Sequence, residues 1–169
     1  MKISNKWKNR ITVIDSKNCK PCEDNHGRIY GIAEKVTPSP PLHPHCRCTI
    51  QILKSLFAGE ATDKGGDGAD WHLKYNGKLP DYYISRSEAN KLGWDRKRKK
   101  LSDIAPGFML YGGIHKNTEG KLPSKPGRIW YEADIEYTLG GRNTKRIVFS
   151  NDGLIFITYD HYRTFMEIR

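Results

Sequence analysis

Beyond Gly127 the chain follows one pattern that few folds can accommodate: apolar and polar residues alternate with a period of two. This is the period of a β-strand whose two faces have different surroundings. The alternation runs through four successive segments, 128–138, 145–150, 154–160 and 164–169. Asn151-Asp152-Gly153 separates the second from the third and favours a tight hairpin turn. The sequence therefore predicts consecutive antiparallel strands.

Helical signals precede these strands. Residues 69–76 predict one short helix. Ser85 and Glu88 have the spacing of a capping box, and the helix that they open should end at Gly93. A further helical turn is predicted at 101–105, before a proline. Helices followed by a meander predict an α+β fold, with N-terminal helices packed on an antiparallel β-sheet.

The front of the chain has a different composition. All four cysteines precede residue 49, and prolines within 37–48 exclude a helix there, so residues 1–50 are expected to be rich in loops. Residues 58–70 are mostly glycine and small polar residues without periodicity, which is typical of a linker. We therefore divide the chain into a small Cys/His-rich module (1–56), a Gly-rich linker (57–68) and a larger domain (69–169).

The charge favours a polyanionic partner. Lys and Arg number 29 against 19 Asp and Glu, a formal net charge of +10, and neutralising phosphates releases condensed counterions. No apolar run is long enough to span a membrane, and residues 1–16 lack the apolar segment of a secretory signal.

Charged residues of the strand region can converge on one sheet face. Alternation places Glu132 and Asp134 on a polar face with Trp130, opposite the predicted core face. Arg142, Arg146 and His161 follow near the ends of the next strands. Each residue alone has an ordinary explanation as a surface pair or a solvated side chain. Together they are suited to phosphodiester cleavage by general acid–base catalysis with electrostatic stabilisation.

From about Ala69 to Arg169 the sequence resembles the bacterial guanyl-preferring ribonucleases of the barnase and binase family. The matching segments are KLPDYYIS-R-SEA (78–89), LGW (92–94), APG (105–107), GG (112–113), EGKLP (119–123), GRIWYEADIEYT (127–138), GRN (141–143), RI (146–147) and DHYRTFMEIR (160–169). The resemblance implies the microbial ribonuclease fold and an endoribonuclease that is monomeric in its catalytic domain.

The same resemblance implies a role for each matching residue. Glu132 would be the general base that deprotonates the ribose 2′-OH, and His161 the general acid that protonates the leaving 5′-oxygen. Arg142 and Arg146 would hold the phosphate, helped by Arg86, which stands where the family has a lysine. The product would be a 2′,3′-cyclic phosphate that is later hydrolysed. Because the RNA supplies its own nucleophile, no metal or other cofactor is required for catalysis.

A guanine site is implied beside these residues. Glu119 would accept hydrogen bonds from the guanine edge, with backbone groups of the loop His115–Thr118. Tyr162 would form a wall of the nucleotide pocket. Thr118 stands where barnase has an arginine, and the loop is one residue shorter, so the resemblance predicts a looser base preference. The run 96–100 is more basic than the family pattern; we interpret it as a solvated loop rather than an additional RNA-binding patch.

The cysteines lie at metal-ligand spacing. Cys19-x-x-Cys22 is followed, after about twenty residues, by His43, His45, Cys46 and Cys48. Such thiolates and imidazoles can hold a structural zinc ion, whereas two disulfides would use the same cysteines. Zinc is the preferred interpretation, because the clustered histidines have no role in a disulfide scheme.

The Cys/His segment also resembles the end of phage Mu F-like head-morphogenesis proteins. This implies an exported or phage-delivered toxin that acts outside its producer, together with a barstar-like inhibitor. The alternative is a phage-derived structural module that binds zinc and RNA without cutting RNA. The joint presence of Glu132, Arg142, Arg146 and His161 favours the enzyme.

Overall fold

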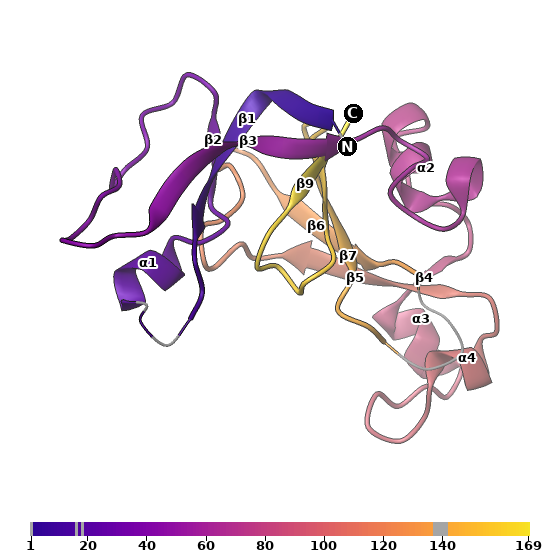
Figure 1. Ribbon diagram of the computed structural model, residues 1–169. Helices are drawn as coiled ribbons and strands as arrows, with labels where there is room; N and C mark the ends of the chain where they lie inside the picture. Colours follow the sequence, from indigo (N-terminus) through magenta and orange to yellow (C-terminus); the bar gives the residue numbers. More distant parts are fainter. Residues whose placement is uncertain (1, 16, 18, 137–141) are drawn as a thin grey trace.

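The computed structural model describes residues 2–15, 17, 19–136 and 142–169. Within these residues one nine-stranded sheet runs through the molecule in the order β2-β1-β3-β9-β8-β7-β6-β5-β4 (Figure 1). The strands are β1 (Lys2–Thr12), β2 (Ile29–Gly31), β3 (Cys48–Leu56), β4 (Tyr83–Ser85), β5 (Met109–His115), β6 (Trp130–Asp134), β7 (Arg146–Ser150), β8 (Ile155–Thr158) and β9 (Met166–Ile168). The helices are α1 (Lys20–Asp24), α2 (Ala69–Tyr75), α3 (Arg86–Lys91) and α4 (Leu101–Ile104), with a 3-10 turn at Gly65–Asp67.

The predicted elements of the larger domain are present. Strands β6 to β9 pair antiparallel with their neighbours in chain order, and α2, α3 and α4 lie where helices were expected. The capping box forms in full: the Ser85 hydroxyl accepts from the Glu88 backbone N–H, and the Glu88 carboxylate accepts from that of Ser85. The molecule is richer in sheet than expected, because β4 and β5 were not predicted; they pair in parallel.

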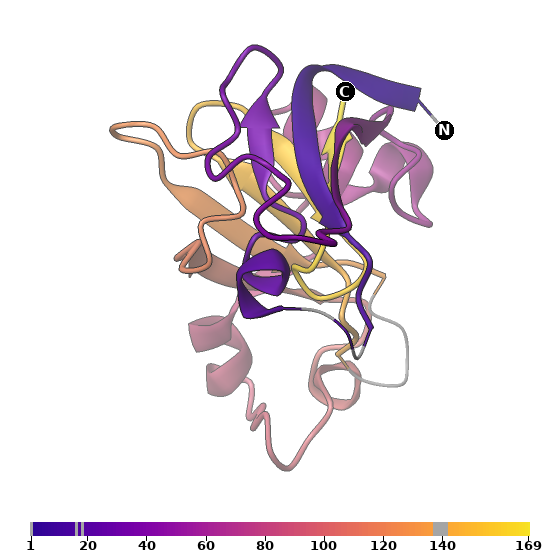
Figure 2. The ribbon, with the colours of Figure 1, turned by 60° about the vertical axis from the view of Figure 1, so that its left-hand side comes forward.

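The front end contains strands that were not predicted, although residues 32–47 form no helix or strand, as expected. Strand β1 pairs with both β2 and β3, and β3 joins β9 in parallel, so the N-terminal strands extend the main sheet (Figures 1 and 2). The buried positions of β1 are all polar, namely Ser4, Asn9, Arg10 and Thr12. A strand that buries polar residues shows no apolar alternation, so the pattern was missed.

Two apolar clusters cover opposite faces of the sheet. One places Ala133, Ile147 and Ile157 beneath α2. The other joins Trp130, Val148 and Phe156 to Leu53 and Ile29 of the N-terminal strands. The face of β6 that was predicted to be polar is therefore apolar at Trp130 and charged at Glu132 and Asp134. Conversely Ile129, which was assigned to the core face, is 41% exposed.

The predicted linker is packed against the larger domain. The buried carboxylate of Asp70 accepts hydrogen bonds from the backbone N–H groups of Gly59 and Ala61 and from the Thr62 hydroxyl. The Tyr159 hydroxyl donates to the Ala61 carbonyl at 2.7 Å. These bonds explain how a segment without periodicity takes a defined path. Among the described residues, no helix combines the length and apolar character needed to cross a bilayer.

The N-terminal module also contacts the loop expected to recognise guanine. The Ile29 backbone N–H donates to the Lys121 carbonyl at 2.8 Å, and the Arg28 guanidinium donates to the Glu119 carbonyl at 3.3 Å. Gly27 packs so closely on the Arg163 carbonyl that a Cβ there would lie 1.9 Å from the oxygen. The module therefore supports two loops of the larger domain.

Candidate active site

Glu132 lies in the middle of β6, opposite Val148 of β7 and Gly113 of β5. A break in register in β5, between Tyr111 and Gly113, brings Gly112 over its side chain. A Cβ at Gly112 would come within 2.8 Å of the Glu132 Cγ, so the glycine leaves room for the carboxylate. The side chain is 20% exposed, which allows contact with a ligand.

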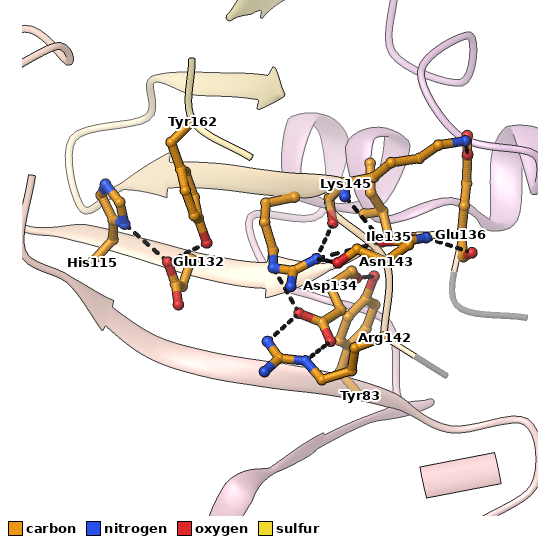
Figure 3. Close-up of polar contacts among 11 residues, drawn as sticks. Tyr83, His115, Glu132, Asp134, Ile135, Glu136, Arg142, Asn143, Lys145 and Tyr162 are labelled. Atoms are coloured by element: carbon orange, nitrogen blue, oxygen red, sulfur yellow. Dashed lines mark hydrogen bonds and ion pairs between the residues drawn. The ribbon is translucent and has the colours of Figure 1, made fainter. Parts of the chain in front are cut away.

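One oxygen of Glu132 carries two neighbours. Its Oε2 accepts from the Tyr162 hydroxyl at 2.8 Å and lies 2.9 Å from His115 Nδ1 (Figure 3). A carboxylate can only accept, so His115 Nδ1 carries the proton. Among the described residues, Oε1 has no hydrogen-bond partner. One oxygen is thus fixed and the other is available to a substrate hydroxyl.

These contacts set the pKa of Glu132. Burial alone raises the pKa of the carboxyl, but the hydrogen bonds from His115 and Tyr162, with the electrostatic attraction of His115 and Arg146, outweigh burial and lower it. Burial also raises the pKa of Tyr162, which keeps its hydroxyl protonated as a donor. Glu132 is therefore held as a carboxylate, as a general base requires.

The two predicted phosphate-binding arginines share one carboxylate. Arg142 donates to both oxygens of Asp134, at 2.6 and 2.8 Å (Figure 3). Arg146 Nε lies 3.0 Å from Asp134 Oδ1, although the angle is not that of a hydrogen bond. Asp134 is 1% exposed, so a buried carboxylate holds both guanidinium groups in place. Arg146 lowers the Glu132 pKa less than the hydrogen bonds from His115 and Tyr162 do.

His161 lies in the turn between β8 and β9. His161 and Tyr162 both have positive φ, 55° and 66°, a conformation uncommon outside glycine. The Asp160 carboxylate stabilises this turn, accepting from the backbone N–H groups of Arg163 and Thr164. His161 is exposed, and its ring centroid lies 4.9 Å from that of Tyr162. The Tyr162 ring lies equally close, at 4.9 Å, to His115.

The site residues border two hollows. A cavity of about 380 Å³ is lined by Glu132, Tyr162, Glu119 and the loop His115–Thr118. A second, of about 460 Å³, is lined by residues that include Arg142, Arg146 and His161. The structure therefore gathers the predicted base with the guanine-site residues, and the predicted acid with the arginines. Arg86 borders neither hollow; it is exposed at the first turn of α3.

Two functional contacts were missed from the sequence. The His115 side chain, expected to contribute only backbone groups, contacts Glu132 directly. Asp134 organises the arginines, and its signal was present: it shares the strand parity of Glu132. His115 gave no such signal, because β5 was not predicted.

Comparison with known proteins decides the family. The sequence model of the family described as ribonuclease matches residues 68–169. This chain belongs to the ribonuclease family. Family membership and the curated relatives make it an endoribonuclease, with RNA as its substrate.

Three curated relatives are described as ribonucleases. One from Bacillus intermedius is 43% identical over 121 residues, covering 72% of this chain and 74% of that protein. One from Bacillus pumilus is 48% identical with the same coverage. One from Heyndrickxia coagulans is 48% identical over 101 residues, covering 60% of this chain and 92% of that protein. The solved structure of ribonuclease Sa2 with guanosine-2′-cyclophosphate aligns with 52% of this chain and 94% of that chain at 24% identity, with a TM-score of 0.32, too low to bear on the fold.

A second cluster of reactive side chains lies in the N-terminal module. Cys19 and Cys22 Sγ lie 3.0 and 3.3 Å from His43 Nε2, and Cys22 also groups with Cys46 and Cys48. All four cysteines are free thiols. His45, which was predicted as a ligand, belongs to neither group and is exposed with a φ of 62°.

Proposed function

We propose that this ribonuclease cuts single-stranded RNA, preferentially after guanosine, by transesterification to a 2′,3′-cyclic phosphate followed by hydrolysis. The observation that carries the proposal is the state of Glu132, which lines the hollow: Oε2 is held by two neighbours, while Oε1 has no hydrogen-bond partner among the described residues. A base that is fixed, ionised and open on one side suits proton abstraction from a 2′-OH.

In the first step, Glu132 Oε1 takes the proton of the 2′-OH group while the ribose 2′-oxygen forms a bond to phosphorus. His161, as imidazolium, gives its proton to the 5′-oxygen as the P–O bond breaks. Arg142 and Arg146 stabilise the charge on the non-bridging oxygens, and Asp134 holds them in place. Hydrolysis of the cyclic phosphate reverses the two roles, because Glu132 then carries the proton.

Guanine recognition is proposed for the hollow of about 380 Å³. Asn117 fixes its loop, since its side chain bonds both the carbonyl and the N–H of Leu122. The Glu119 carboxylate is 69% exposed and pairs with Lys121, so it can turn to accept the N1–H and N2–H of guanine. Tyr162 offers its ring as a wall, and Thr118 adds no charge to this edge.

The test uses fluorescent single-stranded RNA and guanylyl, adenylyl and pyrimidine dinucleotides, each with excess EDTA. Cleavage should persist in the chelator, because an acid, a base and arginines suffice for this mechanism. It should be fastest after guanosine and absent on DNA, which lacks the 2′-OH. Abolition of cleavage by EDTA, with the fold intact by circular dichroism, would contradict the mechanism. Equal rates after all bases would contradict the role of Glu119.

We also propose that the N-terminal cluster binds a structural zinc ion. The Sγ atoms of Cys22 and Cys46 lie 3.8 Å apart. Two thiolates bound to one tetrahedral zinc ion have a similar separation, ~3.8 Å. His43 Nδ1 bonds the Pro44 carbonyl at 2.7 Å, which fixes the tautomer with Nε2 free to ligate. The residues therefore fit zinc, with five candidate ligands, Cys19, Cys22, His43, Cys46 and Cys48, for four positions.

Metal analysis tests the cluster. Purified full-length protein should contain about one zinc ion per chain. His43→Ala should weaken zinc retention, whereas His45→Ala, a neighbouring histidine outside the cluster, should not. Absence of both zinc and free thiols under denaturing, non-reducing conditions would show disulfides instead.

The biological setting is a further proposal. We infer an exported or phage-delivered effector with a barstar-like inhibitor, a monomeric catalytic domain and action outside the producer. The resemblance of the Cys/His segment to phage head-morphogenesis proteins supports this. Cytoplasmic expression of the full chain should arrest growth, and the His161→Ala protein should not. Harmless expression of a protein that is active in vitro would count against the effector role.

A further inference from the structure

The hollow that contains His161 is lined by more cations than the reaction needs. Besides Arg142 and Arg146, three basic residues border it, Arg96, Lys99 and Lys100, all from the loop between α3 and α4. This loop holds the basic run that we interpreted from the sequence as simply solvated. The structure instead directs part of it to the predicted phosphate site.

The loop has a defined base. Trp94 and Leu101, at its two ends, are 5% and 0% exposed and pack in a small apolar cluster. Between them, the Asp95 carbonyl accepts from the N–H groups of Arg98 and Lys99, and its carboxylate accepts from that of Lys97. The chain therefore makes a fixed turn on Asp95, which determines which basic side chains face the hollow.

The charges facing the hollow are not compensated. Asp95 pairs with Arg98, at 3.6 Å. Within the described part of the chain, Arg96, Lys99 and Lys100 have no carboxylate within ion-pair distance. Asp134 is already shared by the two arginines. Several unpaired cations in one concavity attract a polyanion more strongly than the same charges spread over a surface.

We propose that Arg96, Lys99 and Lys100 form a binding subsite for RNA phosphates on the 3′ side of the cleaved bond. The assignment to the 3′ side rests on the proposed function. His161 protonates the leaving 5′-oxygen, so the departing nucleotide lies on the His161 side. The loop borders that hollow, whereas Glu132 and the guanine-site residues line the other one.

The subsite predicts a dependence on RNA length at one end only. Full-length protein would be titrated with fluorescent 2′-O-methyl RNA, which lacks the nucleophile and is not cut. The oligonucleotides would be a guanosine dinucleotide, the same extended by three nucleotides on the 3′ side, and the same extended on the 5′ side. The 3′ extension should tighten binding about tenfold, and log K should fall with log salt by about 0.7 per phosphate contact.

The loop supplies its own matched control. Lys99→Ala should lose part of the 3′ gain and the triple variant Arg96→Ala/Lys99→Ala/Lys100→Ala nearly all of it. Lys97→Ala, with the same charge change on the same loop but outside the hollow, should keep it. Equal losses in Lys97→Ala and Lys99→Ala, or a gain from the 5′ extension alone, would overturn the subsite.

Cleavage of an unmodified guanylyl dinucleotide separates this proposal from the proposed function. The triple variant should cut it at close to the wild-type kcat/KM, because the dinucleotide has only the cleaved phosphate and offers no further phosphate on the 3′ side for the loop to bind. A parallel loss on the dinucleotide would place the three residues at the cleaved phosphate and refute the subsite. Wild-type protein that cuts no RNA but shows the 3′ gain would refute the proposed function and leave the subsite supported.

Discussion

The N-terminal module and the ribonuclease region belong to one sheet, but they bury different kinds of side chain. Strand β1 buries Asn9, Arg10 and Thr12, whose polar groups need specific partners: Arg10 donates to the Pro38 carbonyl and to Cys48 Sγ. Strands β7 and β8 bury mainly apolar residues, Ile147 and Phe156 among them, beside the polar Arg146, Ser150 and Thr158. A buried polar group is stable only when it is hydrogen-bonded, whereas an apolar core tolerates small shifts. The stability of the module therefore depends on the hydrogen-bond partners of its buried polar groups, whereas the stability of the ribonuclease region depends on its own apolar core.

The largest expected effect lies in the ribonuclease region. Glu132→Ala removes the base, which water replaces only in part, so kcat should fall on the order of a hundredfold or more. His161→Ala should cost more, because an unprotonated 5′-oxyanion is a poor leaving group, and the basic limb of the pH–rate profile should disappear. Steady-state kinetics on a dinucleotide measures both.

His72→Ala, a histidine on α2 outside both hollows, is the control and should retain activity. Near-normal cleavage by the His161→Ala protein, with the basic limb unchanged, would show that another group is the acid.

The contrast between strands that bury apolar residues and strands that bury polar residues also explains what the sequence could predict. Apolar alternation in β6 to β9 and the capping box at Ser85 are local signals, and the structure confirms both. The polar strand β1 and the short strand β4 carry no such signal, and their pairing depends on contacts distant in sequence. The resemblance identified Glu132 and His161, but the contact from His115 required the register of β5.

The second prediction concerns the module. Cys22 belongs to both ligand groups, so Cys22→Ser or a strong chelator should release the metal and loosen α1 and the segment that follows it. A loss of about 2 kcal/mol would lower Tm by roughly 4–8 °C for a chain of this size. The kcat of the folded protein should remain within about twofold, because no cluster residue borders either hollow.

Calorimetry and dinucleotide kinetics on the same samples test this separation. His45→Ala should leave Tm unchanged. A fall in kcat that parallels metal release would contradict the separation of the two regions. The module would then control catalysis through its contacts with Glu119 and Lys121.

The third prediction concerns the loop of the ribonuclease region that the N-terminal module contacts. Glu119→Gln leaves one carbonyl where guanine requires two acceptors, so the guanosine-to-adenosine ratio of kcat/KM should fall about tenfold or more. The rate after adenosine should change little, because Glu132 and His161 are untouched. Glu34→Gln, the same substitution on the module's surface, is the control. An unchanged ratio would remove Glu119 from base recognition.

The smallest expected effect is a shift in the pH–rate profile. Because His115 donates to the charged form of Glu132, removing the donor destabilises the carboxylate and raises its pKa. His115→Phe keeps a ring against Tyr162 but has no donor, so the acid limb of kcat/KM should move to higher pH. Tyr162, Arg146 and Arg142 still face Glu132 in this variant, so the shift is bounded.

His115→Gln provides the matched comparison, because its amide can donate to Oε2 without carrying charge. It should shift the acid limb less than His115→Phe, and at pH values well above the limb both variants should approach the wild-type rate. The direction follows from the sign of the interaction: a donor lowers the pKa of the base, so its loss removes activity on the acidic side only. Rates measured from pH 3 to 8 test this, and an acid limb that stays in place in His115→Phe would show that Tyr162 and Arg146 alone hold Glu132 ionised.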